Sequence, residues 1–515
     1  MFDHVVLTAS NDSQADAYRT ELAHRGLDAR STPAATVVPD PRGHRVGSGV
    51  STLLALADLA QRWSRDAHQP GESAPAPASR FARKRVCIIH AGGDSRRLPA
   101  YAAQGKIFTP LPIATPDPRH ATLFDVLLDD YSRIPLPDDG RVVIATGDVF
   151  LDIGSRELGF DRPGVVGVAW ASSPDRGSRH GVYKLDPAGE VTGFLHKPAP
   201  TEAAAGGAVR DDGTVLIDTG VVCLDPATVA HWLKRTGELR DRARRGASPQ
   251  IDLYGDILPA IARREPSHGI NWHHQTPFHA AVVPTSPFLH IGSSRELLDV
   301  LIDTDSHIAT WKPLNKTGSR ARVLNSRLDA EPRALGDRVL IESSAIVRAP
   351  SLPGNNILVG VPPELDRPIE LPEGWGMVCL PIHDLPDMQG PDADLWVAVC
   401  FGVEDDFKTP LHAGGTLGNR PMREFLERAG LDPAQLWRSS DEGSGTAEND
   451  RTLWAARLWT PTVAGAMLDP VAWMWSGTLP PLGWSESCRL TLAEVMAAVD
   501  HARLLDARER VLGCV

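Results

Sequence analysis

One stretch of this sequence combines glycines with closely spaced basic residues directly after a short apolar run. The run Val86–Ile89 is followed by Gly92, Gly93, Arg96, Arg97 and Lys106. Glycine has no Cβ atom, so the backbone amides of such a loop can come close to an anion. Arginine binds oxygen atoms in pairs, whereas lysine acts as a point charge. The stretch predicts a polyphosphate-binding loop; a surface turn with solvated basic side chains is the competing interpretation.

Two common nucleotide-binding patterns do not occur in this chain. The sequence contains neither GxxxxGK[ST] nor GxGxxG, and GSGVST at residues 47–52 comes nearest to the second pattern. Its glycines, Gly47 and Gly49, precede a stretch with helical spacing. This second glycine loop is a weak signal by itself, so the loop after Ile89 is the stronger candidate for phosphate binding.

Polyphosphate chemistry also needs a divalent cation, which carboxylates hold. Asp148 follows an apolar run and a glycine in ATGDVF, the position at which the carboxyl end of a parallel strand opens into a crevice. Asp148 is therefore a candidate Mg²⁺ ligand, although Gly-Asp is also a common turn pair. The stretch QIDLYGD offers Asp252 or Asp256 as a second carboxylate, and a helix N-cap role is equally compatible with either.

Lys197 in FLHKPA lies between an apolar run and a proline. A lysine there can reach a phosphate on a second substrate. A solvated side chain is the competing interpretation. Histidines at 268, 273, 274, 279 and 290 lack the paired spacing and acidic neighbours of a zinc helix. We therefore expect no zinc site among them.

Composition limits the class of protein and its partners. At 515 residues the chain is long enough for two or three domains. Its net charge of −12 argues against nucleic acid or an anionic membrane as a partner. Six cysteines without a CxxC pair predict reduced, mostly buried thiols. With neither a signal-peptide pattern nor a long apolar run at the start, a cytoplasmic protein is expected.

Alternating strand and helix patterns predict an α/β domain with a mostly parallel sheet, Rossmann-like, over residues 1–320. The β-branched run 4–10 reads as a buried strand, and helical spacing from residue 12 ends at Gly26. A second helix is expected after the glycine loop at 47–52. Further strands are expected over 85–89, from Arg141 with an end at Gly147-Asp148, and in GVVGVAWASS and TVLIDTGVVCLD.

The pattern changes beyond residue 320. The aliphatic residues over 335–362 recur at short intervals without helical spacing, which predicts a β-rich, β-helix-like segment over 321–404. Tryptophans become frequent from about residue 405 onwards, beside stretches with helical spacing such as MREFLERAG. We expect a mainly helical, Trp-rich module over 405–515.

The opening stretch, AGGDSRRLPAYAAQGK, resembles the signature of L-fucose-1-phosphate guanylyltransferases, also called GDP-L-fucose pyrophosphorylases. The same signature occurs in the N-terminal half of bifunctional fucokinase/guanylyltransferases. Other stretches agree in order: VVLTASNDSQADAY, GSGVST, HGVYKL, FLHKPA, IDTGVV, IDLYGD, FLHIGSSREL, NNILVGVP and LWAARLWTP. In the early glycine loop, Val50 and Ser51 replace the smaller residues usual for the family.

The resemblance implies a GT-A-like nucleotidyltransferase that condenses GTP with L-fucose 1-phosphate, with Mg²⁺ as cofactor. Arg96, Arg97 and Lys106 then bind the triphosphate, with the backbone of Gly92 and Gly93 beneath it. Asp148 holds the metal together with Asp256, which we prefer over Asp252. The remaining substrate contacts are Lys197 to the sugar phosphate, Thr219 and Gly220 in the sugar pocket, and Gly47 and Gly49 in the early loop.

Two alternatives stay open at this point. The same fold could act on another sugar 1-phosphate or another nucleotide, because base choice rests on contacts that sequence does not locate. The chain could also be a catalytically idle sugar-nucleotide-binding protein. The retained basic residues and Asp148 argue against the second alternative, since a decayed site should have lost some of them.

Overall fold

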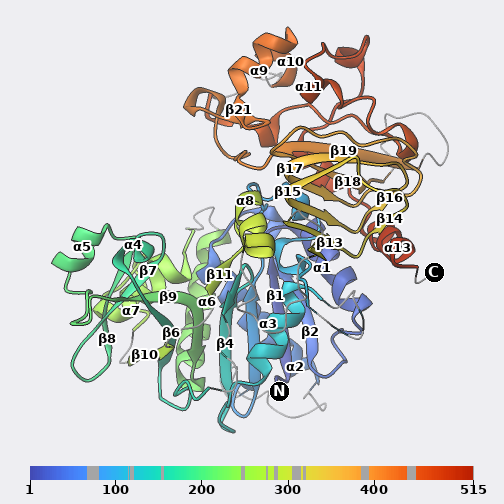
Figure 1. Cartoon of the computed structure of the whole chain (residues 1–515). Helices are drawn as coiled ribbons and strands as arrows, with labels where there is room; N and C mark the ends of the chain where they lie inside the picture. Colours follow the sequence, from blue (N-terminus) through green and yellow to red (C-terminus); the bar gives the residue numbers. More distant parts are fainter. Residues whose placement is uncertain are drawn as a thin grey trace. The chain divides into compact units, whose positions relative to one another are not determined.

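The computed structural model of the chain describes fourteen stretches, which form two compact units (Figure 1). The described residues are 1–66, 80–113, 115, 117, 121–151, 153, 156–244, 250–273, 276–283, 288–303, 315–316, 320–383, 394–437 and 448–513. The N-terminal unit comprises residues 1–93 and 123–289, and the C-terminal unit comprises 94–122 and 290–515. The division falls inside the basic loop, directly after Gly93.

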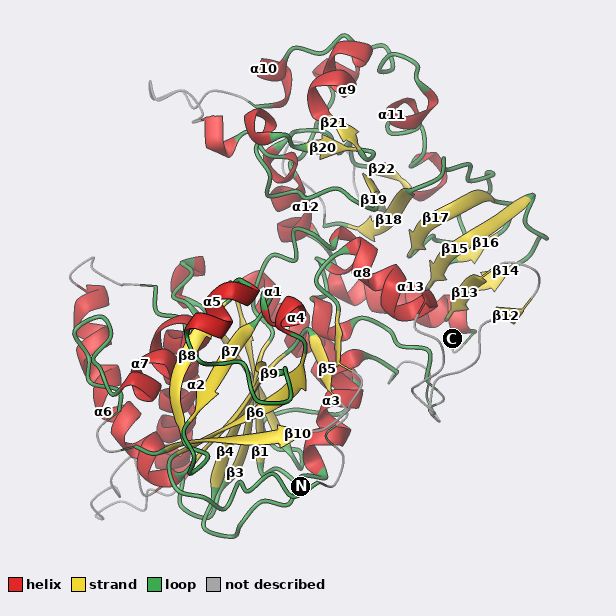
Figure 2. Cartoon of the chain, turned by 60° about the vertical axis from the view of Figure 1, so that its left-hand side comes forward, coloured by secondary structure: helices red, strands yellow, loops and turns green. Residues whose placement is uncertain are grey.

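A mixed sheet forms the centre of the N-terminal unit (Figure 2). Its order is β10 (Phe278–Val283), β6 (Val165–Ser172), β9 (Val215–Leu224), β4 (Arg141–Thr146), β3 (Arg85–His90), β1 (His4–Ala9) and β2 (Ala34–Pro39). Strands β2, β1, β3 and β4 run parallel to one another, and β10 is parallel to β6. Strand β9 is antiparallel to both β4 and β6. The hairpin of β7 (Gly181–Leu185) and β8 (Val191–His196) joins the sheet through β9.

Helices of the N-terminal unit connect these strands. They are α1 (Asp12–His24), α2 (Ser48–Asp66), α3 (Leu123–Ser132), α4 (Pro174–Gly177), α5 (Pro200–Ala205), α6 (Pro226–Arg244) and α7 (Leu258–Arg263), with one π-helical turn at Leu253–Ile257. Leu53, Leu56 and Leu59 recur on one face of α2 and are fully buried. They belong to the same apolar core as Trp232 of α6 and Ile88 of β3. This shared core is what holds the helices on the sheet.

The C-terminal unit has its own sheet, ordered β12 (Asn315–Lys316), β13 (Arg320–Leu324), β15 (Ala334–Glu342), β17 (Ser351–Val359), β18 (Trp375–Pro381), β19 (Leu395–Gly402) and β22 (Thr462–Val463). Strands β13, β15, β17 and β18 pair in parallel, and the outer pairs are antiparallel. Two short ladders join β14 (Arg327–Leu328) to β16 (Ala345–Ile346) and β20 (Thr416–Leu417) to β21 (Arg420–Pro421).

The described helices of this unit are short. They are α8 (Ser294–Leu298), α9 (Met422–Ala429), α10 (Pro433–Leu436), α11 (Trp473–Ser476), α12 (Leu492–Ala498) and α13 (His501–Leu512). Irregular chain and 3₁₀ turns separate them. The predicted mainly helical module is therefore not confirmed, and neither is the β-helix-like segment.

The predicted α/β class with largely parallel sheets is confirmed. The strand that begins at Arg141 ends at Thr146, directly before Gly147 and Asp148 as predicted, and the short β5 (Val149–Leu151) follows this turn. The two observed units do not test the predicted division into three domains, which are 1–320, 321–404 and 405–515. That division stays a prediction.

Two features bear on the composition-based expectations. Cys87, Cys223, Cys379 and Cys400 are free and buried, and Cys488 is exposed; Cys514 lies outside the described residues. Among the described helices, none has the length and apolar character needed to cross a bilayer.

A buried ion-pair cluster ties α1 to α3. The Arg25 guanidinium donates to Glu21 at 2.7 Å and to both carboxylate oxygens of Asp125 at 2.9 and 3.2 Å. Its side chain is only 4% exposed. The pairing compensates a charge that would otherwise be costly to bury.

We therefore expect Arg25→Met to lower the free energy of unfolding by about 3–5 kcal/mol, because the buried Glu21 and the partly buried Asp125 both lose the Arg25 guanidinium. On the same helix, Arg19 pairs with Asp16 in solvent, so Arg19→Met should cost no more than about 1 kcal/mol. Urea unfolding followed by tryptophan fluorescence measures both. Equal losses would show that burial of the Arg25 cluster is irrelevant.

Candidate functional site

Three parallel strands of the N-terminal unit end at one edge of the sheet. His90, the last residue of β3, stands in register with Thr146, the last residue of β4. The Gly147 amide donates to the His90 carbonyl at 3.0 Å. The turn that carries Asp148 and the loop that carries Gly92 therefore leave the sheet side by side, where parallel sheets usually bind ligands.

The two loop glycines are required for different reasons. A Cβ atom on Gly92 would lie 3.3 Å from the backbone of Ala9 and Ser10, at the end of β1. Gly93 has open space around it but adopts φ +133°, which residues with a side chain rarely reach. The prediction that this bend needs bare backbone therefore has a structural basis at both positions.

The basic residues of the same loop lie in the C-terminal unit. The Arg96 guanidinium donates to Asp94 at 2.8 Å and stacks on the ring of Trp454, 5.2 Å from its centroid. The Arg97 carbonyl accepts from the Ser294 amide at 2.8 Å. The Lys106 ammonium donates to the Gly292 carbonyl at 3.0 Å. Residues 292–294, from the stretch FLHIGSSREL, and the Trp-rich region thus hold the cations in place.

The two candidate second carboxylates have different surroundings. Asp252 caps the π-helical turn, accepting from the amides of its first turn at 2.9 and 2.6 Å, and its other oxygen accepts from Ser48 at 2.6 Å. Asp256 accepts from the Asp252 amide at 2.8 Å and lies 3.4 Å from the His268 ring nitrogen. The N-cap alternative thus holds for Asp252. A metal role for Asp256 stays a prediction.

The early glycine loop packs against the same segment. Gly47 has φ +84°, and a Cβ there would lie 2.3 Å from the Ile251 carbonyl oxygen. A Cβ on Gly49 would lie 2.9 Å from that oxygen and 2.7 Å from the Ile257 side chain. Close packing of α2 on residues 251–257 accounts for both glycines. Their contact with substrate stays a prediction.

Thr219 and Gly220 lie on β9 opposite the end of β4. The Thr219 hydroxyl is buried and donates to the Val168 carbonyl at 2.9 Å, so in this structure it is engaged within the sheet. Gly220 has φ +76°, and a Cβ there would lie 2.7 Å from Thr146. Of these two residues, only Gly220 borders the strand end that precedes Asp148.

Lys197 follows β8 and is exposed. It has φ +49°, an unusual conformation for a non-glycine residue. Its amide donates to the His180 carbonyl at 2.9 Å, and within the described part of the chain its ammonium forms no ion pair. The side chain is therefore available to an anionic ligand.

Sequence reasoning missed a buried acid on β9. Asp218 accepts from the Tyr183 hydroxyl at 2.7 Å and from the Gly220 amide at 3.1 Å. Burial raises the pKa of Asp218 to about 6, although both hydrogen bonds lower it, and the charge of Asp252 raises it further. Asp218 precedes Thr219 in the stretch IDTGVV; a charged residue inside an otherwise apolar strand was the available signal.

Two aromatic rings complete the strand-end cluster. Tyr254 donates to the Gly220 carbonyl at 2.9 Å, and its ring meets that of His90 edge-on at 6.1 Å. Burial lowers the pKa of His90 to about 4, while Asp252 opposes that shift. The imidazole is therefore neutral at physiological pH, and its Nε2 lies 2.9 Å from the Thr52 hydroxyl.

The acid side chains at this edge suit a lightly coordinated Mg²⁺. Burial first, and then the charges of Asp218, Asp252 and Asp148, raise the pKa of Tyr254, so these carboxylates share one electrostatic neighbourhood. The described residues contain no ready-made cluster of three or more metal-ligating side chains. Mg²⁺ commonly binds one or two carboxylates together with substrate phosphates, which fits this donor set.

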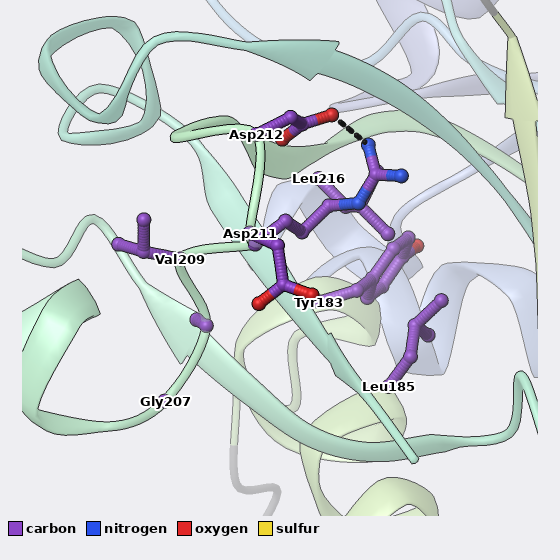
Figure 3. A pocket seen from close by; sticks show the side chains of 9 residues that line it. Tyr183, Leu185, Gly207, Val209, Asp211, Asp212 and Leu216 are labelled. Atoms are coloured by element: carbon purple, nitrogen blue, oxygen red, sulfur yellow. Dashed lines mark ion pairs between the residues drawn. The ribbon is translucent and has the colours of Figure 1, made fainter. Parts of the chain in front are cut away.

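A separate pocket adjoins the other side of Tyr183 (Figure 3). The Tyr183 ring lines it beside Leu185 and Leu216, and the loop 207–212 forms its rim. Asp212 pairs there with Arg210 at 3.2 Å. None of the residues predicted for the site lines this pocket, so it lies apart from the strand-end cluster.

Comparison with known proteins identifies relatives over most of the chain. Residues 78–463 match the family described as "Fucose pyrophosphorylase domain". The chain is 28% identical to the "Bifunctional fucokinase/GDP-fucose pyrophosphorylase" of Arabidopsis thaliana over 92% of its own length, and spans 48% of that protein. It is 23% identical to the Homo sapiens "Fucose-1-phosphate guanylyltransferase", covering 91% of this chain and 83% of that one.

Among solved structures, a protein from Thermus thermophilus titled "mannose-1-phosphate geranyltransferase" matches 78% of this chain and 95% of its own length. The sequence identity is 13% and the TM-score is 0.32. At that score the likeness supports no conclusion about this chain.

The raised pKa of Asp218 predicts a pH-dependent stability. Protonated Asp218 binds its proton more tightly in the folded state than in the unfolded chain. Its contribution to the free energy of unfolding is therefore fully present below about pH 4, and it is lost as the pH rises through about 6. A shift of about two pKa units corresponds to about 3 kcal/mol. Relative to wild type, Asp218→Asn should therefore gain up to about 3 kcal/mol between about pH 4 and pH 7.

Asp212 provides the opposite case, because hydrogen bonds from Thr214 lower its pKa. Asp212→Asn should lose stability relative to wild type as the pH rises. Urea unfolding at a series of pH values tests both variants. A constant difference between Asp218→Asn and wild type would contradict the assignment.

Proposed function

Because the chain belongs to the fucose pyrophosphorylase family, we propose that it condenses GTP with L-fucose 1-phosphate to form GDP-L-fucose and pyrophosphate. The observation that carries the proposal is the glycine bend at the carboxyl end of β3. It lies beside the turn of Asp148, and the amides of Gly92 and Gly93 donate to none of the described residues. Unpaired amides at a strand end suit a phosphate group.

In the proposed reaction, a phosphate oxygen of the sugar 1-phosphate attacks the α-phosphorus of GTP in line. The bond from that phosphorus to the bridging oxygen of the β-phosphate breaks, and pyrophosphate leaves with the electron pair. The nucleophile is already ionised, so it needs no general base. Because it attacks the α-phosphorus directly, no covalent enzyme intermediate is needed. The protein contributes positioning and charge neutralisation.

The residue roles follow from this chemistry. Arg96, Arg97 and Lys106 bind the triphosphate, over the backbone of Gly92 and Gly93. Three guanidinium or ammonium groups oppose the charge of the departing pyrophosphate, which is where charge accumulates as the bond breaks. Lys197 is assigned to the sugar phosphate, and Thr219 and Gly220 to the sugar ring. Gly47 and Gly49 of the early loop are assigned to the nucleotide.

Mg²⁺ is the proposed cofactor, and when bound it neutralises phosphate oxygens. Asp148 and Asp256 are its proposed ligands. Asp256 is preferred over Asp252, because both carboxylate oxygens of Asp252 accept hydrogen bonds within the chain. Neutral His90 beside Tyr254 adds no positive charge that would compete with the cation.

Several finer assignments belong to the same proposal. They are a Rossmann-like, GT-A-type nucleotidyltransferase domain over 1–320, a β-helix-like segment, a helical C-terminal module and a cytoplasmic location. The net charge of −12 argues against a nucleic-acid partner and leaves small anionic substrates to local basic pockets.

A substrate matrix tests the proposed function. GTP and ATP are each paired with L-fucose 1-phosphate and mannose 1-phosphate, and pyrophosphate release is measured with Mg²⁺ present. The expected result is fastest release for GTP with L-fucose 1-phosphate. Faster pyrophosphate release from another pair would show that the chain acts on another sugar 1-phosphate or nucleotide. Nucleotide binding without pyrophosphate release from any pair would identify a sugar-nucleotide-binding protein without activity.

Lys106→Ala is expected to reduce kcat/KM for pyrophosphate release by at least about 10²–10³-fold, since a charge aimed at the phosphates is lost. The fold should persist, because the Lys106 side chain is only partly buried. The matched control is Lys84→Ala, at the opposite end of β3, whose ammonium faces the Trp63 ring. Near-normal turnover of Lys106→Ala would remove this lysine from the site.

A further inference from the structure

Two side chains of helix α1 hold the glycine bend from behind. We propose that Gln14 and Tyr18 are positioning residues that orient the peptide groups of the bend, so that its amides face the phosphate chain of the nucleotide. This inference rests on the proposed function for the identity of the anion. Both residues precede position 78, where the family match begins.

The contacts are direct. The Tyr18 hydroxyl donates to the Ala91 carbonyl at 2.7 Å, and the Gln14 side-chain amide donates to the Gly93 carbonyl at 2.9 Å. Both side chains are buried, with Tyr18 fully so. Burial raises the pKa of Tyr18, so its hydroxyl keeps the proton and remains a donor under any assay condition near neutrality.

Gln14 is itself fixed in one orientation. Its carbonyl oxygen accepts from the Ser10 amide at 2.8 Å and from the Ser10 hydroxyl at 3.0 Å. A backbone amide can only donate, so the oxygen of Gln14 must face Ser10 and its NH₂ group must face Gly93. The N-cap residue Asn11 accepts from the Gln14 amide at 2.8 Å and anchors this turn of the helix.

Peptide geometry turns these contacts into an amide orientation. In a trans peptide group the C=O and N–H bonds point in opposite directions. Because the Ala91 carbonyl is drawn towards Tyr18, the N–H of Gly92 points away from α1. The Gly93 carbonyl is drawn towards Gln14 in the same way, so the N–H of the next residue, Asp94, also points away from α1. Within the described chain no acceptor meets the Gly92 amide, so it is available to a ligand.

Without these two donors, glycine would leave the bend free to rotate. Gly93 has no atom within 4 Å of the position a Cβ would take, so its own packing does not restrict it. Glycine also loses more conformational freedom on ordering than other residues. The helix therefore orders the amides before the ligand arrives, which lowers the entropic cost of binding.

Substitutions that remove one donor and little else test the proposal. Tyr18→Phe keeps the ring and loses only the hydroxyl. Gln14→Met removes the NH₂ donor to Gly93 without adding a negative charge near the phosphates, although it also removes the acceptor for Ser10. The control is Asp16→Asn, an exposed position on the same helix. In both variants, the Kd for inorganic tripolyphosphate, measured by calorimetry, and the KM for GTP should each rise about tenfold. This is the effect of losing one well-placed hydrogen bond. KM for the sugar 1-phosphate should stay unchanged.

A purely structural role predicts a different outcome. The unfolding midpoint would fall while tripolyphosphate affinity stayed at the wild-type value, and that result would overturn the proposal. Hydrogen exchange on the wild-type chain gives a readout that needs no variant. Tripolyphosphate should protect the Gly92 amide, whose peptide carbonyl Tyr18 holds, and absence of protection would also overturn the proposal.

The two proposals fail separately. If the variants lose tripolyphosphate binding but the wild type releases pyrophosphate from no pair of nucleotide and sugar phosphate, the proposed function is wrong and the positioning role stands. If the wild type releases pyrophosphate and the variants bind tripolyphosphate as tightly as the wild type, the proposed function stands and the positioning role is wrong.

Discussion

The parallel pairing of β1, β3 and β4 is the constraint on which the candidate site depends. Parallel strands end at a common edge, so residues that follow Ala9, His90 and Thr146 emerge together although they are far apart in the chain. A one-residue change of register would turn every side chain of a strand to the other face of the sheet. The apolar core behind β3 prevents such a change.

The glycine bend and the cations that follow it belong to different compact units. The bend is held by α1 and the end of β1, whereas Arg96 and Lys106 are held by Trp454 and Gly292. The Trp-rich region therefore does more than cover apolar surface, because one of its rings contacts a cation of the loop. Removal of that region would leave Arg96 without its stacking partner.

Low polarity at the strand edge sets the charge state of the cluster. Burial keeps His90 neutral and raises the pKa values of Asp218 and Tyr254. Each group is held by a hydrogen bond to the chain: Thr52 for His90, Tyr183 for Asp218 and the Gly220 carbonyl for Tyr254. Charges that approach this cluster are poorly screened, which strengthens their effect on phosphate groups.

Local sequence determined the chemistry available to this protein. The strand before Gly92, the bare backbone of the bend, the cations after it and the strand-end position of Asp148 all follow from residue type and neighbours. Tertiary structure decided which partners these groups have. Only long-range contacts show that Thr219 is engaged by Val168, that Asp252 accepts from Ser48 and that Gly47 packs on Ile251. The physical reason is that backbone preference and charge are properties of adjacent residues, whereas hydrogen-bond partners and burial depend on chain segments that meet only after folding.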